Sequence, residues 1–246
     1  MNAPQTGLRL YAAGSLRAVM TELAATVGIP LDPVYGASGL LRERIAAGEP
    51  AEIFASANLH HPQALSQAGG FGPVQVFTRN EICALTGPAE PATTGTLLER
   101  MLMHDIRLGM STPKADPCGD YALEVFDRAD RVRPGARAAL HAKALQLTGG
   151  PDSPMPPAGR NVYAWLMQQR QADILLTYRT NALLAMHENP ALRQVPLPAG
   201  LAVNADYGLV IACSARPEAR RFAEFVLNSN GQAILARHGF AGLTGR

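Results

Sequence analysis

The chain has 246 residues, of which 47% are hydrophobic and 17% charged, a composition typical of a soluble globular protein. Its 22 Lys and Arg residues against 20 Asp and Glu residues give a formal charge of +2. Because no basic run occurs, the charge gives no case for nucleic acid as a partner. No apolar run is long enough to span a bilayer.

Strand-like and helix-like segments alternate in the first third of the chain. Residues 8–11 predict a strand, and a helix follows from Leu16, with apolar residues recurring at helical spacing. The next segments are strands at 31–34, 51–55, 74–77 and 82–85, with a helix at 40–47 that Gly48 and Pro50 end.

The same alternation continues to the C-terminus. Residues 149–159 are rich in Pro and Gly and predict a loop. The alternation predicts an α/β fold with mainly parallel sheets, and the length indicates two lobes. The expected strands are 106–109, 172–178 and 207–213, and the expected helices are 120–129, 134–147, 162–169, 217–227 and 231–237.

Short stretches at four places put a small or hydroxyl residue where an amphipathic helix begins, at 12–17, 35–40, 116–122 and 159–162. A helix N-terminus carries unpaired N–H groups and about half a positive charge, so it binds anions readily. Such termini converging on one cleft would hold a small oxyanion with neutral dipoles alone. This pattern favours a binding protein over an enzyme.

Each residue of this pattern also has a purely structural explanation. Ser is a preferred N-cap, so Ser15 and Ser38 are expected at N-cap positions in any case. Val162 alone would be a core residue, Tyr178 a strand aromatic and Cys118 a thiol in a polar loop. Only their joint occurrence, in this order, indicates an anion site.

The ordered stretches resemble the molybdate-binding periplasmic proteins that serve ABC transporters, nearly from end to end. The most specific block is Tyr-Gly-Ala-Ser-Gly-Leu at 35–40 with the segment 45–57 that follows it. Further segments similar to that family are 12–16, 116–122, 171–182 and 231–240. Cys118 departs from the family pattern, in which the matching residue is usually small and not a thiol.

The resemblance implies an α/β two-lobe periplasmic-binding-protein fold, type II-like, with the ligand cleft between the lobes. Lobe I would comprise 1–82 and 206–246, and lobe II would comprise 83–205. Crossover strands near 82–85 and 207–213 would join the lobes as a hinge, and ligand binding would favour the closed state.

The resemblance also implies the ligand and its contacts. The ligand would be molybdate or tungstate, with no cofactor, no catalytic residue and no direct ligand to a metal cation. Ser15 and Ser38 would donate hydroxyl and N–H groups, Cys118 and Val162 backbone N–H groups, and Tyr178 its phenol. The expected partners of this monomer are a membrane permease and its ATPase.

The location and three alternative functions stay open at this point. The resemblance implies the periplasm, yet residues 1–7 lack the basic and apolar regions of a signal peptide, so the chain is expected to be either cytosolic or a mature form. The first alternative is a cytosolic oxyanion-sensing module. The second is a hydrolase or transferase that uses Cys118, and the third is a binding protein for another small anion.

The remaining cysteine, histidine and acidic residues predict structural roles. Cys83 and Cys213 lie in apolar, strand-like runs and are expected to be buried, and a Cys83–Cys213 disulfide is the minority alternative. His60 and His61 do not predict a metal-binding pair, because adjacent side chains point apart. They are expected in a solvated loop instead. The carboxylates expected to serve turns and helix caps are Asp116, Asp120 and Asp173.

Overall fold

The computed structural model describes residues 7–243, which fall into two compact units. Unit 1 is Met1–Asn80 with Asp206–Arg246, and unit 2 is Glu81–Ala205. The sequence places these boundaries after residues 82 and 205. The N-terminal segment 1–6, on which the signal-peptide expectation rests, lies outside the described residues.

Unit 1 contains a sheet with the strand order β2-β1-β3-β9. Strand β1 is parallel to β2 and β3, and β9 is antiparallel to β3. Strands β4 and β9 each begin in one unit and end in the other. The elements are β1 (Leu8–Ala13), η1 (Gly14–Leu16), α1 (Arg17–Val27), β2 (Leu31–Gly36), α2 (Ser38–Ala46), β3 (Ile53–Ser56), α3 (His60–Gln67), β4 (Gln75–Thr86), β9 (Asn204–Ile211), α9 (Pro217–Leu227) and α10 (Ser229–Arg237).

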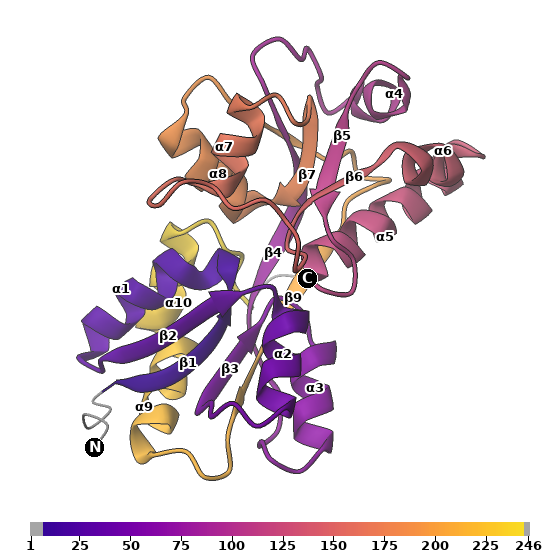
Figure 1. The fold of residues 1–246 in the computed structure, drawn as a ribbon. Helices are drawn as coiled ribbons and strands as arrows, with labels where there is room; N and C mark the ends of the chain where they lie inside the picture. Colours follow the sequence, from indigo (N-terminus) through magenta and orange to yellow (C-terminus); the bar gives the residue numbers. More distant parts are fainter. Residues whose placement is uncertain (1–6, 244–246) are drawn as a thin grey trace. The chain divides into compact units, whose positions relative to one another are not determined.

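Helices cover both faces of the unit 1 sheet: α1, α9 and α10 on one face, α2 and α3 on the other (Figure 1). Helix α9 shows why the sequence folds this way, because its buried residues Ala219, Phe222, Ala223 and Val226 recur at helical spacing along one side. On the other face a buried cluster joins the sheet to α2 and α3; its members are Tyr11, Leu41, Ile45, Phe54, Leu65 and Val210.

Unit 2 contains a second sheet with the order β4-β7-β5-β6, and β8 pairs with β4. Strand β5 is parallel to β6 and β7, whereas β4 is antiparallel to β7 and β8. The elements are α4 (Leu97–Leu102), β5 (Leu108–Ser111), α5 (Pro117–Val132), α6 (Ala136–Lys143), β6 (Leu145–Thr148), α7 (Val162–Gln168), β7 (Ile174–Tyr178), α8 (Arg179–Glu188) and β8 (Arg193–Pro196).

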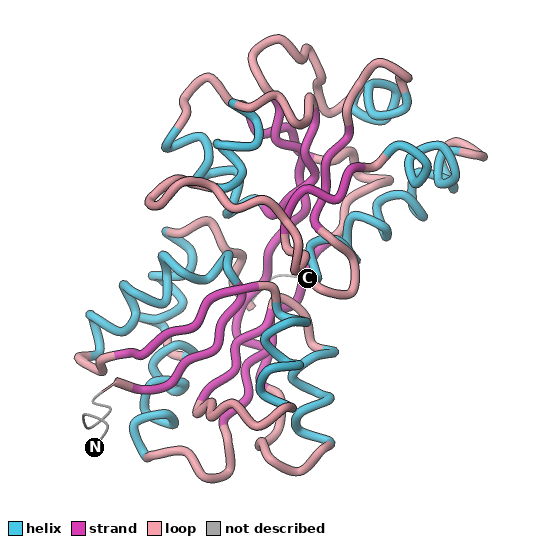
Figure 2. Tube along the Cα trace, viewed as in Figure 1, coloured by secondary structure: helices cyan, strands magenta, loops and turns pink. Residues whose placement is uncertain are grey.

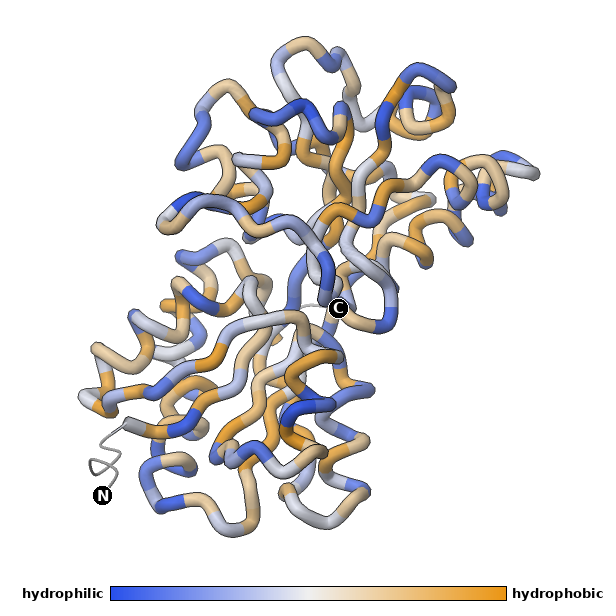
Figure 3. The backbone as a smooth tube through the Cα atoms, in the orientation of Figure 1, coloured by the Kyte–Doolittle hydropathy of each residue, from blue (hydrophilic) through white to orange (hydrophobic). Residues whose placement is uncertain are grey.

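The helices of unit 2 also form two groups, α7 with α8 and α5 with α6 (Figure 1). A long loop joins β6 to α7 (Figure 2), as the Pro- and Gly-rich sequence predicts. The strands β3 and β7 are largely hydrophobic (Figure 3) and are buried along their whole length. No helix within residues 7–243 is long and apolar enough to cross a membrane.

The α/β class is confirmed, but several expected elements are wrong. The two strands expected at 74–77 and 82–85 are one strand, β4. The parallel pairs are accompanied by antiparallel ones, of β9 with β3 and of β4 with β7 and β8. The helix expected at 134–147 ends at Lys143, and residues 145–148 form β6 beside β5. Helices α3, α4 and α8 and strand β8 were not predicted from the sequence.

Three expectations about single residues are also corrected. Cys213 is exposed after the end of β9, although Cys83 is buried as expected, and both are free, so the disulfide alternative is wrong. Cys118 is buried in the first turn of α5 rather than in a polar loop, because Pro117 already starts that helix. His60 and His61 begin α3, and His61 is buried.

Candidate functional site

In unit 1 two helix starts follow neighbouring strands. Ala13 and Gly36 pair at the ends of β1 and β2, so the residues that follow them lie at the same edge of the sheet. Ser15 lies inside η1, and Ser38 is the first residue of α2. The expectation that these serines are N-caps is wrong, because Ala13 and Ala37 hold the capping positions without a side-chain bond.

Ser38 is arranged as a hydrogen-bond donor. It is 1% exposed, and its Oγ accepts the Ala57 N–H at 3.1 Å. Within residues 7–243 the N–H groups of Ser38 and Gly39 form no backbone hydrogen bond, as expected for the first turn of a helix. Because its oxygen already accepts a bond, the Ser38 hydroxyl proton can be given to an acceptor such as an anion.

The Ser15 side chain contacts a residue that is distant in the sequence. Its Oγ lies 2.9 Å from the hydroxyl oxygen of Tyr207, which is fully buried in β9. Asn80 Nδ2 donates to the same Tyr207 oxygen at 3.3 Å. Sequence reasoning missed Tyr207 because it lies 192 residues from Ser15, and no local pattern links them.

In unit 2 the parallel strands β5 and β7 end at one edge of the sheet. The loop after β5 leads to the start of α5, and Tyr178 is the last residue of β7. The rings of Tyr178 and Tyr121 meet edge-on with centroids 6.4 Å apart. This edge therefore brings Tyr178 close to the first turns of α5, where Cys118 lies.

The backbone of Cys118 is already engaged in this structure. Its N–H donates to Asp116 Oδ1 at 3.0 Å, and the Gly119 N–H donates to the Asp116 carbonyl at 2.9 Å. Burial raises the pKa of the Cys118 thiol well above its usual range, with the nearby Asp116 charge adding to the effect. A buried neutral thiol is a poor nucleophile, which counts against the hydrolase or transferase alternative.

Asp116 and Asp120 have the turn and capping roles expected of them. Asp116 caps α5, and Asp120 Oδ1 accepts the Lys114 N–H at 2.8 Å. Burial raises the pKa of Asp116 from 3.8 to about 6, and the Asp120 charge adds to this rise. Asp173 instead pairs with Arg107 at 2.6 Å, which lowers the pKa of Asp173.

Val162 is placed at a helix start as predicted. It is the first residue of α7, and Asn161 caps this helix by accepting the Ala164 N–H at 3.0 Å. The Val162 N–H forms no backbone hydrogen bond within residues 7–243. It is therefore a donor that remains available for a ligand.

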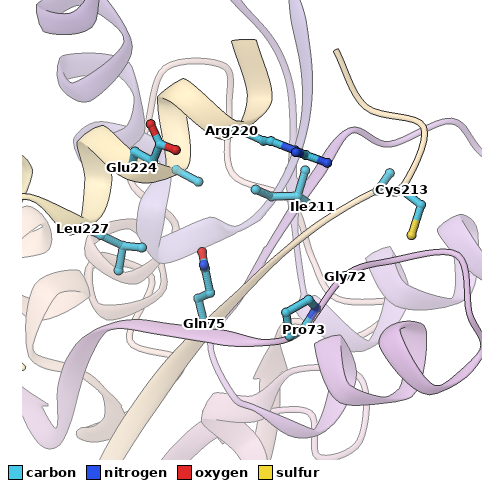
Figure 4. Close-up of a pocket in the computed structure, with 10 residues that line it drawn as sticks. Gly72, Pro73, Gln75, Ile211, Cys213, Arg220, Glu224 and Leu227 are labelled. Carbon is cyan, nitrogen blue, oxygen red and sulfur yellow. The ribbon is translucent and has the colours of Figure 1, made fainter. Parts of the chain in front are cut away.

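A surface groove of about 370 Å³ lies elsewhere in unit 1, between α9, the start of β4 and the end of β9 (Figure 4). Its charged residues are Arg220 and Glu224, and Cys213 lies at its rim. Ile211 pairs with Ile53 at the start of β3, so the groove is at the sheet edge opposite the ends of β1 and β2. None of the predicted site residues lines it.

The described residues hold no candidate metal centre. Within residues 7–243 no group of three or more His, Cys, Asp or Glu side chains is close enough to hold a metal ion. The donors that the helix starts present are N–H and O–H groups. Groups of this kind bind anions rather than metal cations.

Two solved structures share the fold across nearly the whole chain. The sulfate-binding protein SubI from Mycobacterium tuberculosis H37Rv has a TM-score of 0.77 at 16% identity, covering 98% of this chain and 88% of that one. The periplasmic molybdate-binding protein of Azotobacter vinelandii has a TM-score of 0.71 at 17% identity, covering 95% of this chain and 98% of that one. At such identities the likeness shows the fold alone.

Comparison of this sequence with known proteins identifies the family of the chain. An uncharacterized protein of Pasteurella multocida (strain Pm70) is 36% identical over 195 residues, which is 77% of this chain and 81% of that protein. The family model of the bacterial extracellular solute-binding proteins matches residues 8–241. The chain belongs to the bacterial extracellular solute-binding protein family.

Proposed function

We propose that this solute-binding protein captures a small tetrahedral oxyanion, molybdate or tungstate foremost, for uptake by an ABC transporter. The observation that carries the proposal is the edge of unit 1 at which Ser15 and Ser38 lie. Both serines are buried there, with hydroxyls beside helix-start N–H groups that form no backbone hydrogen bond. The molybdate- and sulfate-binding proteins that share the fold support an oxyanion as the ligand class.

Neutral donors are well suited to this task. A buried oxyanion loses its hydration, so each of its oxygens needs a hydrogen-bond donor in the protein. Helix-start N–H groups supply donors already fixed in position, which lowers the entropy cost of binding. The donors that we propose for the oxyanion are, in unit 1, the hydroxyl and N–H groups of Ser15 and Ser38. In unit 2 they are the Val162 N–H, the Tyr178 phenol and the Cys118 N–H.

The size of the anion decides which tetrahedral anions the proposed site prefers. Molybdate and tungstate are similar in size and charge, so a ring of fixed donors discriminates between them weakly. Sulfate is smaller and would leave some donors of the same ring without a partner, which costs affinity. The proposed partners are a membrane permease with its ATPase, and the proposed location of capture is the periplasm.

Isothermal titration of the dialysed protein with molybdate, tungstate, sulfate and phosphate tests the proposal. We expect tight one-to-one binding of molybdate and tungstate, with much weaker binding of sulfate and phosphate. Preference for sulfate or phosphate would keep an anion-binding role and reject the ligand. Absence of heat with all four anions would reject oxyanion capture, and mass spectrometry of co-purifying molecules would then identify the solute.

A further inference from the structure

The start of α5 already holds an anion of its own. Pro117 has no N–H, the Cys118 N–H donates to the Asp116 carboxylate at 3.0 Å, and the Gly119 N–H donates to the Asp116 carbonyl at 2.9 Å. The positive end of this 16-residue helix therefore faces a carboxylate supplied by the chain itself. A bound oxyanion would have to share these donors with Asp116.

A second observation at the same place concerns a buried hydroxyl. Ser111, at the end of β5, is fully buried, and its Oγ makes no hydrogen bond of good geometry. It neighbours the Asp116 carboxyl and the Cys118 thiol closely enough to influence the pKa of both. A buried hydroxyl without a partner costs free energy, so the Ser111 hydroxyl is a donor with unused capacity beside the helix start.

The carboxyl of Asp116 is enclosed on its other side by the loop after β6. A Cβ added to Gly149 would lie 2.5 Å from Asp116 Oδ2, so only glycine fits against this oxygen. Gly149 also has a φ of +77°, which glycine adopts without strain. The carboxyl is thus held close against the backbone rather than pointing freely into solvent.

The titratable groups around Asp116 are acids or neutral groups. Asp120 lies on the same helix, the Cys118 thiol lies beside it, and the Tyr163 phenol faces it from α7. Within residues 7–243 no ion pair joins Asp116 to a Lys, Arg or His side chain. No cation in the described chain therefore offsets the charge of Asp116 at this helix start.

We propose that Asp116 is a specificity-determining residue, an internal anion whose charge competes with the external oxyanion for the start of α5. The inference rests on the proposed function. While Asp116 is ionised, it repels a dianion and holds the Cys118 N–H. When its charge is removed, the repulsion at this helix start is lost, and the affinity for a dianion rises. Asp116 thus sets how strongly the protein binds fully ionised oxyanions.

Asp116→Asn tests this role without removing the helix cap, because Asn and Asp cap helices about equally well. Titration with sodium molybdate at about pH 8 should show that D116N binds about 5- to 50-fold more tightly than the wild type. The matched control is Asp120→Asn, which removes a neighbouring charge of the same helix turn. We expect D120N to change the affinity by less than about twofold.

A second titration at about pH 6, where molybdate is still a dianion, completes the test. Wild-type affinity should rise toward that of D116N as the pH falls, while D116N should bind equally at both pH values. Equal or weaker binding by D116N, with the wild type binding molybdate, would overturn the inference alone, as would an equal gain in D120N. Failure of the wild type to bind any of the four oxyanions would overturn the proposed function and the inference together.

Discussion

The starts of η1 and α2 in unit 1 are open, whereas the start of α5 in unit 2 is closed by its own chain. The N–H groups of Ser38 and Gly39 form no backbone hydrogen bond within the described residues, but the N–H groups of Cys118 and Gly119 both bond to Asp116. The difference teaches that a helix start read from sequence is only a potential anion site. Its capping residue decides whether the donors remain available.

The carboxylates Glu52 and Asp116 differ in a similar way. Glu52 in unit 1 binds the Arg216 guanidinium through two bonds of 2.7 and 2.8 Å, and this pair lowers the pKa of Glu52 to about 2. Asp116 in unit 2 has no such partner among the described residues, and burial raises its pKa to about 6. Glu52 is therefore a paired charge, as is the buried Glu90 of unit 2, which binds Arg100 through bonds of 2.7 and 2.8 Å, whereas Asp116 has no cation beside it in the described chain.

Breaking the satisfied charge should have the largest effect. Arg216→Ala removes the bidentate partner of the buried Glu52 and leaves it only the Arg9 guanidinium at 3.9 Å, so the free energy of unfolding should fall by about 2–4 kcal/mol. Urea unfolding followed by circular dichroism measures the loss. The control Arg44→Ala breaks the exposed pair with Glu49 and should cost less than about 1 kcal/mol. Equal losses in both variants would show that the burial of Glu52 has no energetic consequence.

Removing an open donor of unit 1 should have the next largest effect. Ser38→Ala should weaken molybdate binding by about 1–3 kcal/mol, because a donor to a charged ligand is lost. Ser229→Ala is the matched control, since Ser229 is also the first residue of a helix, α10. Calorimetric titration of both variants gives the difference. If S38A binds as tightly as S229A, then Ser38 has only a structural role.

The two carboxylates should give stability opposite dependences on pH. Glu52 contributes stability that is present above pH 4.5 and is lost as the pH falls toward about 2. Asp116 has a raised pKa in the folded state, so stability falls as pH rises from 3.8 to about 6. Thermal unfolding should show that the stability of D116N relative to the wild type increases by about 2–3 kcal/mol across that pH range. A constant difference between the two proteins would contradict the raised pKa.

Loosening the support of Ser15 should have a smaller effect. Tyr207→Phe removes the hydroxyl 2.9 Å from Ser15 Oγ, so Ser15 is held less firmly, and binding should weaken by about 0.5–1.5 kcal/mol. Titration of Y207F, Ser15→Ala and the double variant forms a cycle. The effects should not add, because the two groups act through one hydrogen bond. Additive losses would show that Tyr207 acts independently of Ser15.

The smallest effect should come from the buried thiol. Cys118→Ala keeps the backbone N–H that the proposed site uses, so molybdate affinity should change by less than about 0.5 kcal/mol. The thiol is buried and its pKa is raised, so no reactivity is lost with it. A large loss of affinity measured by titration would give the side chain a role that this geometry does not explain.

Strands and periodic helices could be predicted because their patterns are local. Strands β1, β2 and β7 and helix α9 follow from their apolar residues, and so does the position of Tyr178 at a strand end. The start of α5 at Pro117 could also have been found, since Asp followed by Pro is typical of a helix start. Asn58 is also a residue type common at helix starts, and in the structure its side chain accepts the His61 N–H at 3.2 Å, one residue before the capping position Leu59.

The remaining features depend on contacts that no local pattern contains. Strand β6 extends an alanine-rich helical pattern, and only pairing with β5 makes it a strand. Tyr207 lies 192 residues from Ser15, and Glu52 lies 164 residues from Arg216. The bond between Asp116 and Cys118 is local, yet its consequence depends on the burial supplied by Ser111 and Gly149.

A crystal structure grown with tungstate tests the central claim most directly, because tungsten gives a strong anomalous signal. The account predicts one tungsten position whose oxyanion accepts hydrogen bonds from the hydroxyls of Ser15 and Ser38. Tungsten bound at the groove beside Arg220, with Ser15 and Ser38 making no contact to it, would contradict the account.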